Sequence, residues 1–134
     1  PLFGGMTLAL ACYVILPTGL NLRPYYVPGS DIFARAVRFL YRTDTPINVC
    51  PSIHVFNSVT LLLAYYRSRL FERPRLRWMR PAAAVLCGSI VCSTVLLKQH
   101  SCIDVVLGIL LALALDAAFT AASEYSELLQ TRRV

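Results

Sequence analysis

The sequence predicts an all-α integral membrane protein, a helical bundle with about four transmembrane helices and a short amphipathic helix at the membrane surface. Hydrophobic residues make up 57% of the 134 residues and charged residues only 15%, against about 45–50% and about 25% in soluble domains. The apolar residues gather in long runs, and arginines concentrate in one segment between two runs. This composition excludes collagen-like, disordered and coiled-coil chains.

Four apolar runs are the expected membrane helices. They cover residues 2–17, 53–66, 81–97 and 102–122. At 1.5 Å per residue the last two runs reach about 25–30 Å, enough for the hydrocarbon layer of a bilayer. Because the chain is apolar almost from Pro1, we expect residues 1–134 to form a single membrane-embedded domain that lacks its N-terminal helices.

A polar segment, residues 18–52, separates the first two runs and contains a candidate interfacial helix. Its apolar and arginine residues alternate at a spacing typical of a short amphipathic helix at the membrane surface. The pattern consists of Ile32, Phe33, Arg35, Val37, Arg38, Phe39, Leu40 and Arg42. Ser30 or Asp31 would cap the N-terminus of this helix. A solvated connector helix is the alternative interpretation.

The basic loop between the second and third runs predicts the orientation of the chain. It carries Arg67, Arg69, Arg73, Arg75, Arg77 and Arg80. Cytoplasmic loops of membrane proteins are rich in such residues, so we place this loop in the cytoplasm. A nucleic-acid-binding patch is the alternative, but a basic loop between apolar runs is more typical of a topological anchor, and we expect no nucleic-acid partner. Residues 18–52 and 98–101 then share the extracytoplasmic face, and we expect a plasma (inner) membrane location.

Both histidines of the chain fall on this outer face, at the mouths of expected helices. His100 and Asp104 are four residues apart, so on a helix they would lie on one side. A carboxylate that accepts one imidazole N–H fixes the tautomer and leaves a lone pair on the other nitrogen. His100 is therefore a candidate nucleophile.

His54 is the candidate general acid. It follows Pro51 and Ser52 at the start of the second run, where free backbone N–H groups and the helix dipole favour a bound anion such as phosphate. Histidine titrates near neutral pH, so it can protonate a departing oxygen. Arg23 and Lys98 are the cations best placed to hold phosphate oxygens. Either histidine alone would suggest only a surface or capping residue.

Other uses of these polar residues receive less support. A zinc site would need Cys50 and Cys102 as extra ligands, and no recognised ligand spacing is present, so we expect no metal. The five cysteines are odd in number and do not suggest a disulfide framework. Asp116, in the fourth run, could be a proton relay, but a pairing with Asn57 or Thr60 inside the bundle is the favoured interpretation.

Three sequence motifs resemble those of the type 2 phosphatidic acid phosphatase family, the membrane histidine phosphatases. The family pattern Lys-x6-Arg-Pro appears as Arg23-Pro24 with Leu16 in place of the Lys. The pattern Pro-Ser-Gly-His appears as Pro51-Ser52-Ile53-His54. The pattern Ser-Arg-x5-His-x3-Asp appears as Ser93-Thr94 followed by His100 and Asp104.

This resemblance implies the last four helices of a six-helix core and a metal-independent, cofactor-free phosphoric monoester hydrolase acting on a lipid or lipid-like phosphate. His100 would form a phosphohistidine, Asp104 would orient it, and His54 would protonate the leaving group. The implied phosphate ligands are Arg23, Ser52 and Lys98. The departures from the motifs resemble the branch near inositol phosphorylceramide synthases, so transfer of the phosphoryl head group to an alcohol is an alternative. A non-catalytic membrane scaffold, allowed by Leu16 and Thr94, is another.

Overall fold

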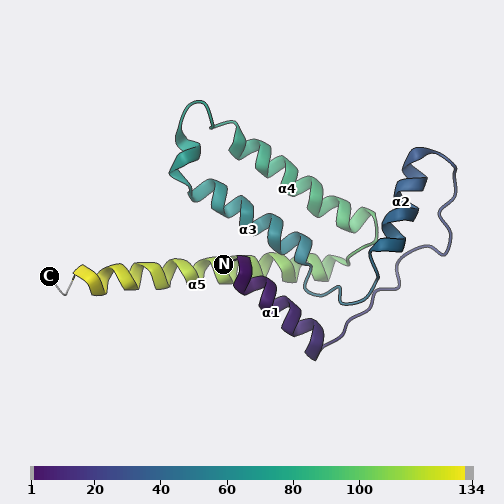
Figure 1. The fold of residues 1–134 in the computed structure, drawn as a ribbon, viewed down its shortest axis with the longest axis horizontal. Helices are drawn as coiled ribbons and strands as arrows, with labels where there is room; N and C mark the ends of the chain where they lie inside the picture. The colour runs from purple at the N-terminus through teal and green to yellow at the C-terminus, as the bar shows by residue number, and fades with distance from the viewer. Residues whose placement is uncertain (1, 132–134) are drawn as a thin grey trace.

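The computed structural model describes residues 2–131, which fold into five α-helices and one short 3-10 helix (Figure 1). These are α1 (Leu2–Ile15), α2 (Ile32–Thr43), α3 (Ile53–Arg67), η1 (Arg69–Glu72), α4 (Met79–Leu96) and α5 (Cys102–Thr131). Within the described residues the only extended pairing is an isolated bridge between Gly19 and Ile47. The predicted all-α membrane bundle is confirmed.

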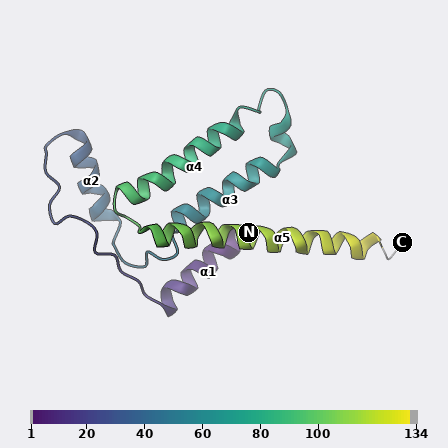
Figure 2. The same ribbon diagram turned by 180° about the vertical axis from the view of Figure 1, so that it is seen from behind.

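Helix α3 is the centre of the bundle and packs against α4, α5 and α1. It forms an antiparallel hairpin with α4, and the two helices lie side by side in both views (Figures 1 and 2). Val55 and Phe56 of α3 are fully buried. A Cβ atom at Gly5 would lie 2.0 Å from the Phe56 ring, so the close crossing of α1 over α3 depends on a residue without a side chain.

Two helices, α4 and α5, are long and apolar enough to cross a membrane, with mean hydropathies of 1.6 and 2.3. Only 11% and 22% of their apolar windows are buried inside the protein, whereas an apolar helix in a soluble core would be mostly buried. The other two expected spans form shorter helices. Helix α1 ends just before Pro17, and α3 carries His54 and other polar residues in its first half.

Helix α2 lies apart from the hairpin and begins as predicted. Asp31 is its N-cap, and the carboxylate accepts hydrogen bonds from the backbone N–H groups of Phe33 and Ala34. Phe33 and Phe39 are 79% and 69% exposed, as expected for a helix that lies in the membrane interface. The hydroxyl of Tyr41 donates to the Leu97 carbonyl at 3.0 Å and ties α2 to the end of α4.

An ion pair joins the far end of α3 to the middle of α5. Arg67 lies 2.6 Å from the carboxylate of Asp116 and also donates to the Thr120 hydroxyl. The expected pairing of Asp116 with Asn57 or Thr60 is therefore wrong. The long side chain of Arg67, in the last turn of α3, extends as far as α5. Its positive charge there compensates the Asp116 carboxylate, which would otherwise stand unpaired in an apolar helix.

Candidate active site

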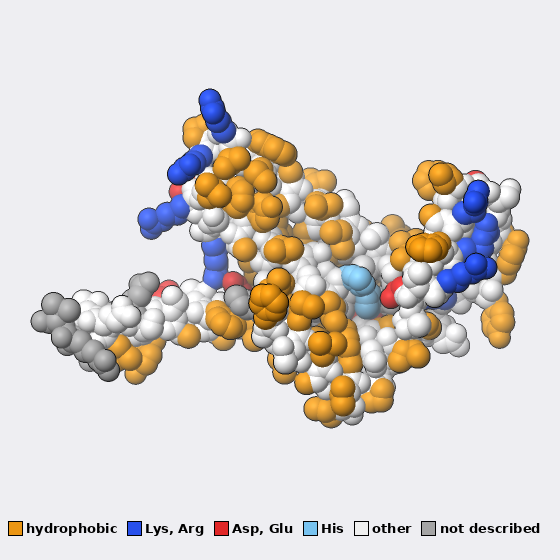
Figure 3. Space-filling view, viewed as in Figure 1, with side chains coloured by type: hydrophobic (Ala, Val, Ile, Leu, Met, Phe, Trp, Pro, Cys, Tyr) orange, Lys and Arg blue, Asp and Glu red, His pale blue; other side chains and the backbone are white. Residues whose placement is uncertain are grey.

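The two histidines meet at one end of the bundle, where α3 and α5 begin and α4 ends. The ring centroids of His54 and His100 are 5.7 Å apart, and the rings make an edge contact at 64°. Histidine is visible on the face shown in Figure 3, whereas the basic loop lies at the other end of the α3–α4 hairpin. The structure thus brings together the two side chains that the sequence assigned to one face.

His54 is positioned by the first turn of α3. Ser52 is the N-cap, and its hydroxyl accepts the N–H of Val55 at 3.4 Å. The N–H of Ser52 donates to the Asp104 carbonyl at 3.2 Å, which fixes the start of α3 against the start of α5. Ser52 is fully buried by this arrangement, whereas His54, two residues along, is exposed.

His100 is positioned by the connection between α4 and α5. The Thr94 carbonyl accepts the N–H groups of both Gln99 and His100, at 2.9 and 3.1 Å, so the chain folds back over the end of α4. His100 is only 7% exposed. The expectation that His100 and Asp104 share one face of a helix is wrong, because α5 begins only at Cys102. Their proximity comes from the turn that precedes this helix.

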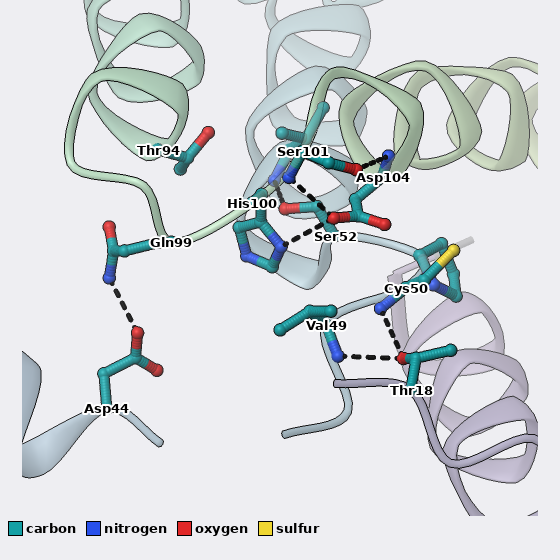
Figure 4. Close-up of polar contacts among 12 residues, drawn as sticks. Thr18, Asp44, Val49, Cys50, Ser52, Thr94, Gln99, His100, Ser101 and Asp104 are labelled. Carbon is teal, nitrogen blue, oxygen red and sulfur yellow. Dashed lines mark hydrogen bonds and ion pairs between the residues drawn. The ribbon is translucent and has the colours of Figure 1, made fainter. Parts of the chain in front are cut away.

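Asp104 caps α5 and faces His100 at the same time (Figure 4). Its Oδ2 accepts the N–H of Ser101 at 2.7 Å, and the Asp104 N–H donates to the Ser101 hydroxyl at 3.3 Å. The same Oδ2 lies 4.0 Å from Nδ1 of His100, which is too far for a hydrogen bond, and this buried Nδ1 has no other partner. An approach of about 1 Å would form the bond.

The environment of His100 favours its neutral form. Burial lowers the pKa of His100 below its usual value, and the neighbouring His54 lowers it further. The carboxylate of Asp104 and the carbonyl of Val49 act in the opposite direction without cancelling this effect. A neutral imidazole keeps a lone pair, which a nucleophile requires.

Both histidines line a cavity of about 160 Å³. Its polar lining includes Tyr13, Asp44, Asn48 and Gln99. The cavity is therefore a polar recess at the end of the bundle where α3 and α5 begin, with two imidazoles in its wall. Within the described residues, no group of three His, Cys, Asp or Glu side chains is arranged to hold a metal ion.

The three predicted phosphate ligands do not line this cavity. Arg23 makes a bidentate contact with Asp44, donating to its carboxylate at 2.7 Å and to its backbone carbonyl, and lies 4.9 Å from the centre of the Tyr41 ring. Ser52 is buried beneath the turn that it caps. Lys98 is exposed in the α4–α5 connection, where its φ of 52° takes the chain out of the helix.

Asp44 and Gln99 are site residues that the sequence did not reveal. The amide of Gln99 donates to the Asp44 carboxylate at 2.9 Å (Figure 4). The same carboxylate oxygen also accepts from Arg23. Asp44 thus links Arg23, of the Arg23-Pro24 segment, to Gln99, the residue before His100. Its partners lie 21 and 55 residues away along the chain, and no local pattern signals contacts at such separations.

The fold and the site together define an integral membrane protein with a paired-histidine centre at one end of a helical bundle. A family model described as the PAP2 superfamily matches residues 1–127. The chain belongs to this superfamily, which confirms the resemblance to type 2 phosphatidic acid phosphatases and supports a phosphatase-type function. Comparisons with curated proteins and with solved structures gave no match.

Proposed function

We propose that the protein is a lipid phosphate phosphatase that works through a covalent phosphohistidine on His100, without a metal ion. The observation that carries this proposal is the pair of imidazoles, His54 and His100, whose centroids are 5.7 Å apart in a polar cavity. Membership of the PAP2 superfamily supports phosphorylated, lipid-like substrates and a membrane location.

In the first step, a nitrogen lone pair of neutral His100 attacks phosphorus. With the imidazole proton on Nδ1, which faces Asp104, the attacking atom is Nε2. A nitrogen–phosphorus bond forms as the bond from phosphorus to the lipid oxygen breaks, and protonated His54 gives its proton to that oxygen. In the second step, His54 takes a proton from water as the water oxygen attacks phosphorus, which releases inorganic phosphate and frees His100.

Substrate binding requires the two rings to separate. The edge contact between His54 and His100 leaves no room for a phosphoryl group between them. His54 is exposed, so its side chain can turn away, whereas His100 is held by its buried loop. We therefore assign His100 the fixed position of the nucleophile and His54 the mobile position of the acid.

Phosphate binding by Arg23, Ser52 and Lys98 stays a prediction. Arg23 uses its two terminal guanidinium nitrogens on Asp44, and its buried Nε has no hydrogen-bond partner. The N-terminal turn of α3 contributes the positive end of a helix dipole beside His54. The extracytoplasmic location of this site in a plasma (inner) membrane is likewise proposed, from the position of the arginine-rich loop at the opposite end of the hairpin.

Trapping of labelled phosphate tests the function. The protein is incubated with a panel of phosphorus-labelled lipid phosphates and quenched in alkali, in which phosphohistidine survives. We expect label on the wild-type protein and none on His100→Ala, with Gly88→Ala on the open surface of α4 as the matched control. No label and no turnover on any lipid phosphate would contradict the proposal and favour the scaffold alternative. Added alcohols distinguish hydrolysis from transfer, because a transferase would move the label to the alcohol.

A further inference from the structure

An apolar groove of about 290 Å³ runs between α3 and α4, near the loop end of the hairpin and away from the histidines. Its lining is almost wholly hydrophobic and includes Leu61, Leu62, Tyr65, Trp78, Ala83 and Leu86. Leu61, Trp78 and Leu86 are 51%, 65% and 62% exposed. In water such a surface would be costly, so an apolar group must cover it.

The mouth of this groove is strongly basic. The loop from residue 69 to 77, which leads into the groove at Trp78, carries exposed arginines: Arg69, Arg73, Arg75 and Arg77. Within the described residues, none of these four side chains makes an intramolecular hydrogen bond or ion pair. Figure 3 shows the basic side chains of this region next to the hydrophobic surface of the hairpin.

Arg80 differs from these four arginines because the fold itself uses it. Its guanidinium donates to the carbonyls of Tyr65, Tyr66 and Ser68 and closes the hairpin. Tyr65 also stacks on Phe71, with centroids 4.4 Å apart. These contacts hold the loop end of the groove in one arrangement. The four unpaired arginines are the charges left for an external partner.

We propose that this groove binds an anionic phospholipid of the leaflet that faces the loop, with an acyl chain along α3 and α4 and the headgroup phosphate on Arg77 and its neighbours. Charge complementarity selects the occupant, because a hydrophobic groove with cations at its mouth matches a lipid with an apolar tail and a negative headgroup. Trp78 lies where the two parts of the lipid join, a position that tryptophan favours in membranes.

Fluorescence quenching tests the site directly, because Trp78 is the single tryptophan of the sequence and lines the groove. The full chain is reconstituted in vesicles that contain brominated phosphatidylglycerol or brominated phosphatidylcholine at equal fractions. We expect the anionic lipid to quench Trp78 more strongly. Arg77→Gln should lower the relative affinity for the anionic lipid by about fivefold, the contribution of one basic side chain near the surface. Arg35→Gln, an exposed arginine on α2 at the other end of the hairpin, should not.

A second variant separates the groove from general surface attraction. Ala83→Phe narrows the groove and should reduce the preference for the anionic lipid, whereas Ala114→Phe on an exposed face of α5 should leave it unchanged. A preference that survives Ala83→Phe would overturn the groove site. Equal quenching of Trp78 by the two brominated lipids would also overturn the groove site. Protection of Trp78 from both lipids would overturn it too, because it would mean that a protein surface covers the groove. None of these measurements depends on turnover at the histidines.

Discussion

Asp104 faces His100 across 4.0 Å while its carboxylate is held by the backbone N–H of Ser101. One carboxylate therefore serves two purposes, since it caps the start of helix α5 and supplies a negative charge beside His100, the proposed nucleophile. The hydrogen bond from Ser101 fixes the direction of the carboxylate, so that Oδ2 points toward Nδ1 of the imidazole. This dual use allows the structural and chemical contributions to be separated by substitution.

Asp104→Asn should lower activity far more than stability. The Asn oxygen can still accept the N–H of Ser101, but the negative charge that would stabilise the positive charge on the His100 ring during attack on phosphorus is lost. We expect kcat/KM to fall between about 10²- and 10⁴-fold. Ser101→Ala is the matched control, because it keeps the Asp104 charge and removes the hydroxyl that accepts the Asp104 N–H at the start of α5. The loss of this cap should cost about 1 kcal/mol of stability. Equal, small losses of activity in the two variants would mean that Asp104 acts only as a helix cap.

The acid limb of the pH profile should report the buried state of His100. Protonation removes the lone pair of the nucleophile, so kcat/KM should fall as the pH drops through the pKa of His100. Because burial lowers this pKa, we expect the midpoint below about 6.5, the ordinary value for histidine. The measurement is kcat/KM against pH with a short-chain lipid phosphate. A midpoint above that value would mean that His100 is not the group whose protonation stops the reaction.

The same lowered pKa has a consequence for stability. Below about pH 6.5 the imidazole of the unfolded chain binds a proton, whereas buried His100 stays neutral. The free energy of unfolding should therefore decrease as the pH falls from that value to the pKa of the folded state. Replacement of His100 by Gln should remove this part of the pH dependence.

His54 should matter most when the leaving group is poor. An alkyl alcohol leaves only when it is protonated, whereas an aryl phosphate such as p-nitrophenyl phosphate leaves as an anion. We expect His54→Ala to slow hydrolysis of an alkyl phosphate by about 10²- to 10⁴-fold and of the aryl phosphate much less. Single-turnover rates with both substrates provide the comparison. Equal slowing would assign His54 to binding instead of proton transfer.

The sequence predicted the helices and the histidine pair well, for physical reasons that differ between them. Long apolar runs tend to form helices, and α4 and α5 lie close to the runs 81–97 and 102–122 that predicted them. Helix α5 continues beyond its run to Thr131, through polar residues that also favour a helix. The meeting of His54 and His100 followed from topology, because both stand at helix ends on one side of the bundle.

The environment of Arg23 could not be predicted in the same way. Its contact with Asp44 joins two loops, and loop-to-loop hydrogen bonds leave no periodic signal. Phosphate binding by Arg23 stays a prediction, and what the sequence did not indicate is that this side chain and the amide of Gln99 both donate to Asp44. The position of His100 in a loop was missed because a His-x-x-x-Asp spacing also fits a helix.

The Arg23–Asp44 contact should stabilise the site modestly. A double-mutant cycle with Arg23→Gln and Asp44→Asn should give a coupling energy of about 1 kcal/mol, because the Asp44 side chain is 37% exposed and solvent screens the pair. If Arg23 acts through Asp44, either single variant should lower kcat with little change in KM. A rise in KM for Arg23→Gln alone would support direct phosphate binding by this arginine.

Gly108 should control the distance between the two histidines. A Cβ atom at this position would lie 2.9 Å from the Ser52 carbonyl and 3.2 Å from Cβ of Val55, so Gly108→Ala must push the start of α5 away from the start of α3. Because these two starts position His54 and His100, we expect a loss of activity that exceeds the loss of helix content. Gly88→Ala is the control, since open space surrounds that glycine and alanine is the better helix former by about 1 kcal/mol. Wild-type turnover in Gly108→Ala would show that the spacing of the two helix starts does not limit catalysis.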